Sequence, residues 1–290
     1  MTLTQRLGHY EKLMRLDKPI GIFLLLWPTL WGLWFAARGI PGIMILTIFV
    51  LGTVLMRSAG CVVNDYADRN FDPHVERTRK RPLAAGLVST KEALLLAAGL
   101  SLCAFILILP LNRLTIELSF VALFLAASYP FTKRFFAMPQ AYLGITFSFG
   151  IPMAFAAQTG EVPSMAWLLM AANLLWVIAY DTEYAMVDKM DDLKIGIKTS
   201  AITFGRFDVA GVMACHAAFL GLMVVIGLIH EMGIVYYAAL MVAVGLILFQ
   251  YRLIQDRDRT RCFKAFLHNN WVGAAIFAGI ALDYLLNAAP

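Results

Sequence analysis

The sequence is poor in charge, in cysteine and in linker-like segments. Only 15% of its 290 residues are charged and only four are cysteine, whereas soluble domains carry roughly 25% charged residues. So little charge combined with 12% aromatic residues excludes intrinsic disorder. The scattered cysteines form no Cys-x-x-Cys pair, so zinc and redox chemistry are not indicated. No Pro/Ser/Gly-rich stretch divides the chain, which predicts a single domain over residues 1–290.

Apolar residues make up 60% of the chain, and the mean hydropathy is +0.73. A membrane span needs ~20 mostly apolar residues to cross the hydrocarbon core. Backbone groups in lipid must be satisfied internally, so each apolar run is expected to be a helix. We therefore predict an all-α integral membrane protein with nine transmembrane helices. They cover roughly residues 20–37, 42–63, 92–110, 114–131, 138–157, 164–182, 207–229, 234–251 and 267–286.

The basic residues predict the orientation of these helices. With a cytoplasmic N-terminus, every Lys and Arg except Arg38 and Arg113 falls on the inner side, as the positive-inside rule requires. The net charge of +5 is then explained by topology and by attraction to anionic lipid headgroups. Nucleic-acid binding is not expected, because the loops lack basic patches with interleaved aromatic residues.

Seven of the 19 acidic residues lie in two short clusters at the inner ends of helices. In the first, we expect the second helix to continue until Pro73 stops it. Asn64, Asp68 and Asp72 would then recur at i, i+4 and i+8 along one stripe.

The second cluster follows the sixth predicted span. Asp181, Asp188 and Asp192 fall at i, i+7 and i+11 on one stripe, whereas Asp191 points elsewhere. A solvated helix end is the ordinary explanation of a charge run, but two facing carboxylate stripes are typical of a Mg²⁺ site. Mg²⁺ binds in proteins through carboxylates and substrate phosphates, so the pattern predicts a pair of Mg²⁺ ions bridged by a diphosphate.

A diphosphate also needs cationic side chains, and several lie near the inner mouth. Tyr129 and Lys133 share a face at the end of the fourth span, and Arg57 shares a face with Asn64. The other candidate cations are Arg69, Arg134, Lys189, Lys194 and Lys198. By contrast, we interpret Arg77, Arg79, Arg81 and the basic residues of 252–264 as topological anchors.

These motifs resemble those of the UbiA superfamily of intramembrane aromatic prenyltransferases. The first cluster resembles its N-D-x-x-D-x-x-x-D motif, Asp188-x-x-x-Asp192 its D-x-x-x-D motif, and Tyr129-x-x-x-Lys133 its Y-x-x-x-K element. The flanking segments are similar to the bacterial 4-hydroxybenzoate polyprenyltransferase branch of the ubiquinone pathway. They are Asp17-Lys18-Pro19-Ile20-Gly21, the segment 180–188 and Lys194-Ile195-Gly196-Ile197-Lys198.

The resemblance implies a fold, a reaction and a location. The fold would be nine helices around a central cavity, capped by helical segments of the cytoplasmic loops at about 65–91 and 183–206. The reaction would be Mg²⁺-dependent transfer of a polyprenyl group from its diphosphate to the ring carbon ortho to the hydroxyl of 4-hydroxybenzoate. The protein would lie in the bacterial inner membrane, with the mouth of its site facing the cytoplasm and the isoprenoid tail leaving between helices into lipid.

Roles for individual residues follow from the resemblance and from their chemistry. The expected Mg²⁺ ligands are Asn64, Asp68, Asp72, Asp188 and Asp192. Lys133, Arg134, Arg69 and Lys198 would neutralise the diphosphate, and the Tyr129 ring would face the allylic cation. Arg57 and Asn64 would orient the benzoate, and Asp188 would remove the ring proton.

Three alternatives stay open at this point. The acceptor could be a naphthoate, a haem or a chlorophyllide, although the Arg57/Asn64 pair favours a small benzoate. A cation or anion transporter would also carry acids in its membrane helices, but near the midplane and with inverted repeats. A structural or lipid-binding subunit would have no need of two carboxylate stripes.

Overall fold

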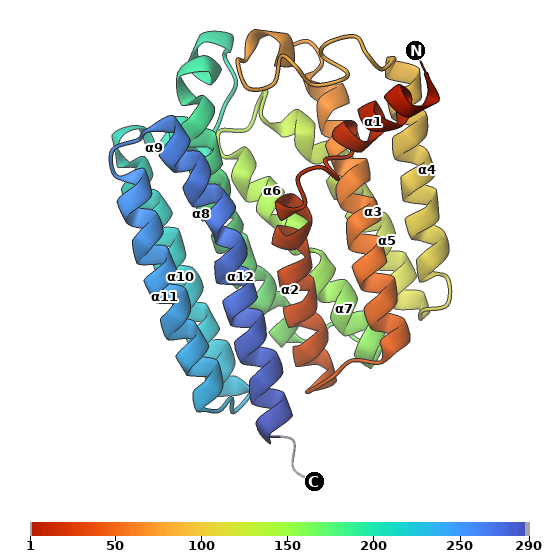
Figure 1. The fold of residues 1–290 in the computed structure, drawn as a ribbon. Coiled ribbons are helices and arrows are strands. Elements are labelled where there is room, and N and C mark those ends of the chain that lie inside the picture. The colour runs from red at the N-terminus through yellow and green to blue at the C-terminus, as the bar shows by residue number, and fades with distance from the viewer. Residues whose placement is uncertain (1, 288–290) are drawn as a thin grey trace.

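A computed structural model of the chain describes residues 2–287, and within that range the regular structure is entirely helical. The α-helices are α1 (Leu3–Leu13), α2 (Ile20–Ala37), α3 (Ile43–Asp68), α4 (Thr90–Ile108), α5 (Arg113–Thr132), α6 (Pro139–Ser148), α7 (Gly150–Thr159), α8 (Ser164–Ile195), α9 (Ser200–Phe204), α10 (Asp208–Ile229), α11 (Ile234–Ile254) and α12 (Arg259–Asn287). Two short 3-10 helices are η1 (Asp72–His74) and η2 (Gly205–Phe207). The long helices run side by side along one direction (Figure 1).

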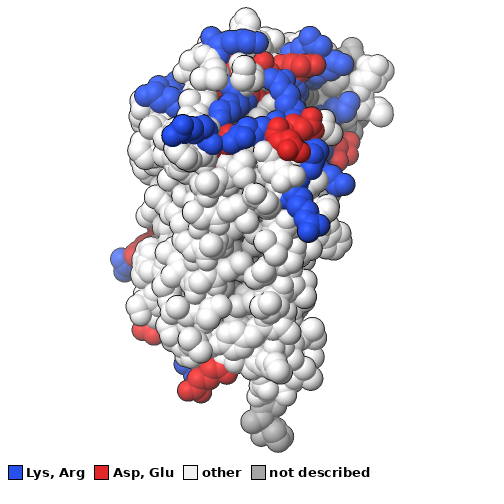
Figure 2. Space-filling view, turned by 90° about the vertical axis from the view of Figure 1, so that its left-hand side faces the viewer, with Lys and Arg blue, Asp and Glu red and all other residues white. Residues whose placement is uncertain are grey.

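Nine helical segments within residues 2–287 are long and apolar enough to cross a membrane, which confirms the predicted fold class. The helix surface is apolar as well: Phe120, Phe124 and Met241 are each more than half exposed. In Figure 2 the middle of the visible face carries no charged side chain, and most of the charge gathers at one end. Such a wide apolar surface has no place in water, so the chain is an integral membrane protein.

The fifth and sixth predicted spans differ from the helices observed. The fifth is broken between α6 and α7, because Pro152 lacks the N–H that would bond the carbonyl of Ser148. The sixth is longer than predicted: α8 runs unbroken to Ile195, and Gly196 ends it in the left-handed region at φ +74°. The first half of the predicted 183–206 cap is therefore the end of α8 itself.

The predicted cap at 65–91 is mainly turns rather than helix. After α3 ends it contains η1 and a series of turns, with buried Leu83 and Val88 packed on α3 and α4. Helix α1 crosses α3 and α4 at this same end (Figure 1). The Tyr10 hydroxyl donates to Glu92 of α4 at 3.1 Å, and fully buried Leu13 joins the same apolar cluster. This end of the bundle is thus closed by packed loop and helix.

Helix α8 is held by an aromatic core. The Trp176 ring lies 5.2 Å from Trp31 of α2 and 5.8 Å from Phe219 of α10, measured between ring centroids. The Trp176 indole N–H donates to Asn269 of α12 at 2.9 Å, and the Asn269 amide donates to Glu183 at 2.7 Å. These contacts join α8 to three neighbouring helices and so set the position of the acidic residues at its end.

Candidate functional site

The first acidic cluster straddles the end of α3. Asp65 and Asp68 belong to the last turn of the helix, and both are buried. The prediction that the helix continues to Pro73 is wrong: α3 ends at Asp68, and Asp72 lies in η1. Pro73 has no N–H to bond the carbonyl of Arg69, and its ring would clash there, so the chain turns earlier. Asp72 nevertheless folds back to the same region and is 5% exposed.

The second acidic cluster remains on one continuous helix. Asp188 and Asp192 lie one turn apart on α8, and both are buried. Asp191 instead pairs with Arg259 at 3.3 Å and Lys194 at 3.8 Å, which confirms that it points elsewhere. The α-helical period therefore separates the two buried carboxylates from the exposed ion pair beside them.

Each cluster has a basic partner from another segment. Lys133, at the end of α5, forms an ion pair with Asp68. Arg77 donates from Nε to the Asp188 carboxylate at 2.9 Å, and its guanidinium lies 4.5 Å from the ring centroid of Tyr184. Because Arg77 comes from the loop after α3 and Asp188 from α8, this pair ties the cap to the second acidic helix.

Arg81 and Arg15 complete the ring of cations. Arg81 lies 3.1 Å from Asp65 and 3.0 Å from Asp72, and Arg15 lies 2.7 Å from Asp65. Burial opposes the charge of Arg81, but the carboxylates of Asp65 and Asp72 raise its pKa above the usual value. Burial raises the pKa of Asp72, and nearby Asp68 and Asp65 raise it further, while Arg81 lowers it.

Arg77 and Arg81, interpreted from the sequence as topological anchors, thus also pair with the buried acids, and Arg15, which the sequence did not single out, pairs with Asp65. None of the three stands in helical register with the acids that it contacts. The only signal in the sequence is the number of acids in the two clusters. Carboxylates that become buried on folding require positive partners. The pairing follows from how the loop after α3 folds, and periodicity does not predict that.

The remaining predicted cations fall at different distances from the acids. Arg134 donates to the backbone carbonyl of Ala67, next to Asp68, and its guanidinium lies 5.4 Å from the Phe71 ring centroid. Lys198 is exposed and donates to the carbonyl of Phe135 at 3.0 Å. Arg69 folds back onto Tyr66, with Nη1 2.8 Å from its carbonyl oxygen. Arg69 and Lys198 thus lie at the rim.

Lys189 and Lys194 do not contact the buried carboxylates of the two clusters. Lys189 pairs with Asp208 at 2.7 Å, beside the start of α10, and Lys194 pairs with Asp191. The sequence placed both near the inner mouth, but their partners are outside the two buried carboxylate groups.

An apolar cavity of about 390 Å³ lies between helices α2 to α7. Arg57 of α3 and Tyr129 of α5 line it. The Tyr129 hydroxyl donates to Asn64 at 3.2 Å, and its ring meets Phe147 edge-on at 6.3 Å. Tyr129 therefore lines the cavity together with Arg57 and also contacts Asn64 of the first acidic motif.

Carboxylates are the ligands that hard divalent cations prefer, but here they do not form a preassembled metal site. Within residues 2–287, no three Asp, Glu, His or Cys side chains are grouped to hold a metal ion. One oxygen of Asp68 is buried without a hydrogen-bond partner, and so is one oxygen of Asp65. A free buried carboxylate oxygen is a ready ligand for Mg²⁺, so the residues fit such an ion once diphosphate supplies further oxygens.

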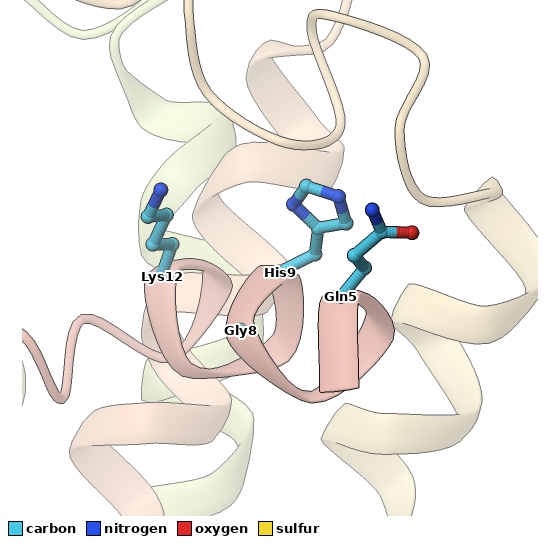
Figure 3. A pocket seen from close by; sticks show the side chains of 4 residues that line it. All are labelled: Gln5, Gly8, His9 and Lys12. Carbon is cyan, nitrogen blue, oxygen red and sulfur yellow. The ribbon is translucent and has the colours of Figure 1, made fainter. Parts of the chain in front are cut away.

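A second hollow, of about 410 Å³, lies at the surface beside α1 (Figure 3). Gln5, Gly8, His9 and Lys12 line it. None of these residues carries a carboxylate, so we assign the hollow no part in the site.

The fold and this arrangement of acids define a class of membrane transferase. A sequence profile of the UbiA prenyltransferase family matches residues 25–272, and the chain belongs to that family. It is 83% identical over 289 residues to a 4-hydroxybenzoate octaprenyltransferase of Nitrosospira multiformis, with 100% of each chain covered. The apo structure of a UbiA homolog from Aeropyrum pernix K1 is 28% identical, with a TM-score of 0.80 over 91% of this chain and 97% of that one.

A more distant structure shares the fold. It is the UbiA homolog from Archaeoglobus fulgidus bound to GPP and Mg²⁺, which is 17% identical with a TM-score of 0.72. The alignment covers 94% of this chain and 99% of that one.

Proposed function

We propose that this protein transfers a polyprenyl group from its diphosphate to the ring carbon ortho to the hydroxyl of 4-hydroxybenzoate, in ubiquinone biosynthesis. One observation carries the proposal: buried carboxylates paired with cations lie at the helix end that carries Asn64, and Tyr129, which lines an apolar cavity, donates to Asn64. A prenyl diphosphate has the same division, an anionic head on an apolar tail. The full-length identity to the Nitrosospira multiformis relative supports the choice of acceptor.

The diphosphate binds among the acids and cations at the mouth. Asn64, Asp68, Asp72, Asp188 and Asp192 would hold the Mg²⁺, which would supply positive charge to stabilise the departing diphosphate. The cations beside these carboxylates, Arg77, Arg81 and Lys133, together with Arg134, Arg69 and Lys198 at the rim, contact the phosphate oxygens.

The allylic end of the prenyl chain occupies the cavity. Its walls are mostly Leu, Ile, Phe, Met and Ala side chains, which exclude water from a cation formed when the C–O bond breaks. The Tyr129 ring lies at the cavity end nearest the acids and presents its π-electrons there. The rest of a long chain passes between the helices into membrane lipid.

The acceptor lies between Arg57 and the acids. The Arg57 guanidinium binds the benzoate carboxylate, and Asn64 helps to orient the ring. The C–O bond to diphosphate breaks first, and the diphosphate leaves with the electron pair. The ortho carbon then attacks the allylic cation, and a C–C bond forms. The proton of the ortho carbon then goes to a carboxylate, for which Asp188 is our candidate.

The protein lies in the bacterial inner membrane with its N-terminus and the mouth of the site on the cytoplasmic side. The gathering of charged side chains at one end of the molecule supports this orientation (Figure 2). It gives the water-soluble benzoate direct access from the cytoplasm, while the prenyl substrate enters from the bilayer.

The test is prenyl transfer in membranes that contain the expressed protein. Labelled 4-hydroxybenzoate is incubated with prenyl diphosphates of increasing length, with Mg²⁺ or with EDTA, and the lipid product is identified by mass spectrometry. We expect Mg²⁺-dependent product from 4-hydroxybenzoate and none with the Asp68→Asn variant. Product only with a naphthoate acceptor, or ion uptake into proteoliposomes without prenyl transfer, would contradict the proposal.

A further inference from the structure

Gly21 and Arg57 lie in unusually close contact across two helices. Gly21 stands in the first turn of α2, and Arg57 projects from the middle of α3. A Cβ atom on Gly21 would lie 2.6 Å from Nη2, 2.9 Å from Nε and 3.1 Å from Cζ of Arg57. Carbon and nitrogen atoms in contact are separated by roughly 3.5 Å or more, so any side chain at position 21 would occupy the space of the guanidinium.

The guanidinium is held in place without an acidic partner. Among residues 2–287, no carboxylate forms a salt bridge with Arg57, and its buried Nε has no hydrogen-bond partner. The guanidinium carbon lies over the face of Phe147, 5.7 Å from the ring centroid. Charged residues inside a membrane bundle are costly and usually serve a function. An arginine kept unpaired beside the cavity is therefore prepared for an anion that arrives later.

We infer that Gly21 is a positioning residue for acceptor recognition. Its missing side chain leaves the space in which the Arg57 guanidinium lies, and so directs the guanidinium toward the benzoate carboxylate. This inference rests on the proposed function, because it takes the acceptor to be a small aromatic carboxylate bound by Arg57. Gly21 itself contacts no substrate and acts only through Arg57.

The inference separates two possible reasons for a glycine at this position. If Gly21 served only the packing of α2, Gly21→Ala would lower stability whether or not Arg57 is present. If it serves Arg57, the effect of the alanine requires the guanidinium, because removal of that group removes the overlap. The two variants then give effects that are not additive.

The experiment uses four full-length proteins purified in detergent: wild type, Gly21→Ala, Arg57→Ala and the double variant. The KM for 4-hydroxybenzoate, the KM for the prenyl diphosphate, kcat and the thermal midpoint are measured for each. We expect Gly21→Ala to raise the KM for 4-hydroxybenzoate by about ten-fold, with little change in the KM for the diphosphate. In the Arg57→Ala background, the added alanine should change neither the KM nor the thermal midpoint further.

Gly99→Ala is the matched control, since Gly99 lies in helix α4 with no atom near its Cβ position. It should leave both KM values unchanged. A Gly21→Ala protein too unstable to assay, but restored in the double variant, would support the inference, because the instability then comes from the overlap with Arg57.

Failure of this inference and failure of the proposed function give different results. An unchanged KM for 4-hydroxybenzoate in Gly21→Ala, beside a raised KM in Arg57→Ala, would overturn the role of Gly21 and leave the proposed function standing. Equal loss of stability in both backgrounds would also overturn it, since Gly21 would then serve helix packing alone. A wild-type protein that does not prenylate 4-hydroxybenzoate would instead overturn the proposed function.

Discussion

Helices α5 and α8 both carry residues of the site, yet their surroundings are opposite. Of the most apolar stretch of α8, 67% is buried within the protein, against 11% of the corresponding stretch of α5. Helix α8 carries Asp188 and Asp192, whereas α5 carries Tyr129 and ends at Lys133. One helix is surrounded by protein, while the other borders the cavity on one side and faces lipid on the other.

The difference corresponds to two tasks. A metal site needs its carboxylates in fixed places, and α8 is fixed by the rings of Trp31, Trp176 and Phe219 and by the Asn269 hydrogen bonds. A cavity for a long flexible prenyl chain needs walls that separate easily. Helix α5, little of which is buried within the protein, borders the cavity proposed for that chain.

The largest expected effect is on turnover and concerns the buried carboxylates. Asp188→Asn, and likewise Asp68→Asn on α3, should lower kcat by about 10²–10³-fold, comparable to the loss of one charge-stabilising group elsewhere. Each change also breaks an ion pair, with Arg77 or with Lys133, so the thermal midpoint should fall as well, and turnover is compared per folded molecule. The measurement is turnover with saturating substrates and Mg²⁺.

Asp191→Asn is the matched control, because Asp191 lies on the same helix but pairs outward with Arg259 and Lys194. It should keep nearly full turnover. Near wild-type turnover in Asp68→Asn or Asp188→Asn would remove that residue from the proposed metal site.

The next effect is on stability and tests the packing around α8 directly. Phe219→Ala empties a fully buried position beside Trp31 and Trp176. Lipid is as apolar as a protein core, so the cavity term dominates. About 100 Å³ of lost volume at ~24 cal/mol per Å³ gives roughly 2–3 kcal/mol of destabilisation. The free energy of unfolding in mixed micelles checks this value.

Phe124→Ala on α5 is the control for that prediction. Phe124 is 67% exposed and faces the surroundings of the bundle rather than its core. We expect the same substitution there to change stability by less than about 0.5 kcal/mol. Similar losses of stability at Phe219 and Phe124 would mean that the surroundings of α8 and α5 do not differ in the way described.

A third effect concerns acceptor affinity on the cavity side. Arg57→Ala should raise the KM for 4-hydroxybenzoate by about ten-fold to hundred-fold, because charge-assisted hydrogen bonds contribute about 1.5–3 kcal/mol. The KM for the prenyl diphosphate should barely change. Arg57→Lys should restore only part of the loss, since an ammonium lacks the planar pair of donors. If Arg57→Ala weakens both substrates equally, Arg57 belongs with the diphosphate cations or with the fold.

The smallest effect probes the polar contacts that hold α8. Asn269→Leu removes the partners of both the Trp176 indole and Glu183, and should destabilise the protein by about 1 kcal/mol, as is usual for hydrogen bonds between membrane helices. Turnover per folded molecule should change little. Asn270→Leu, which loses only the bond to Trp27, should cost less. A larger loss in Asn270→Leu would show that Asn269 does not anchor α8.

How far the sequence alone reaches can be judged from particular elements. Apolar runs predicted nine spans because the bilayer fixes the length of a helix and forces its backbone bonds inward. The two acidic motifs placed Asp188 and Asp192 on one helical face, and α8 has them there, because the α-helical period holds along an unbroken helix. In each case the rule concerns neighbouring residues, and neighbouring residues are what a sequence shows.

Tertiary structure alone decided what meets across the bundle. Asp72 reaches the site through a turn rather than along a helix, and Arg77 and Arg81 contact the acids from a loop without periodicity. The close approach of Gly21 to Arg57 likewise joins two helices whose packing no local pattern encodes. The hydrogen bonding within a helix, and the helix length that the membrane requires, depend on the residues of each segment alone. Contacts between segments depend on the simultaneous packing of all the helices, and therefore appear only when the whole chain has folded.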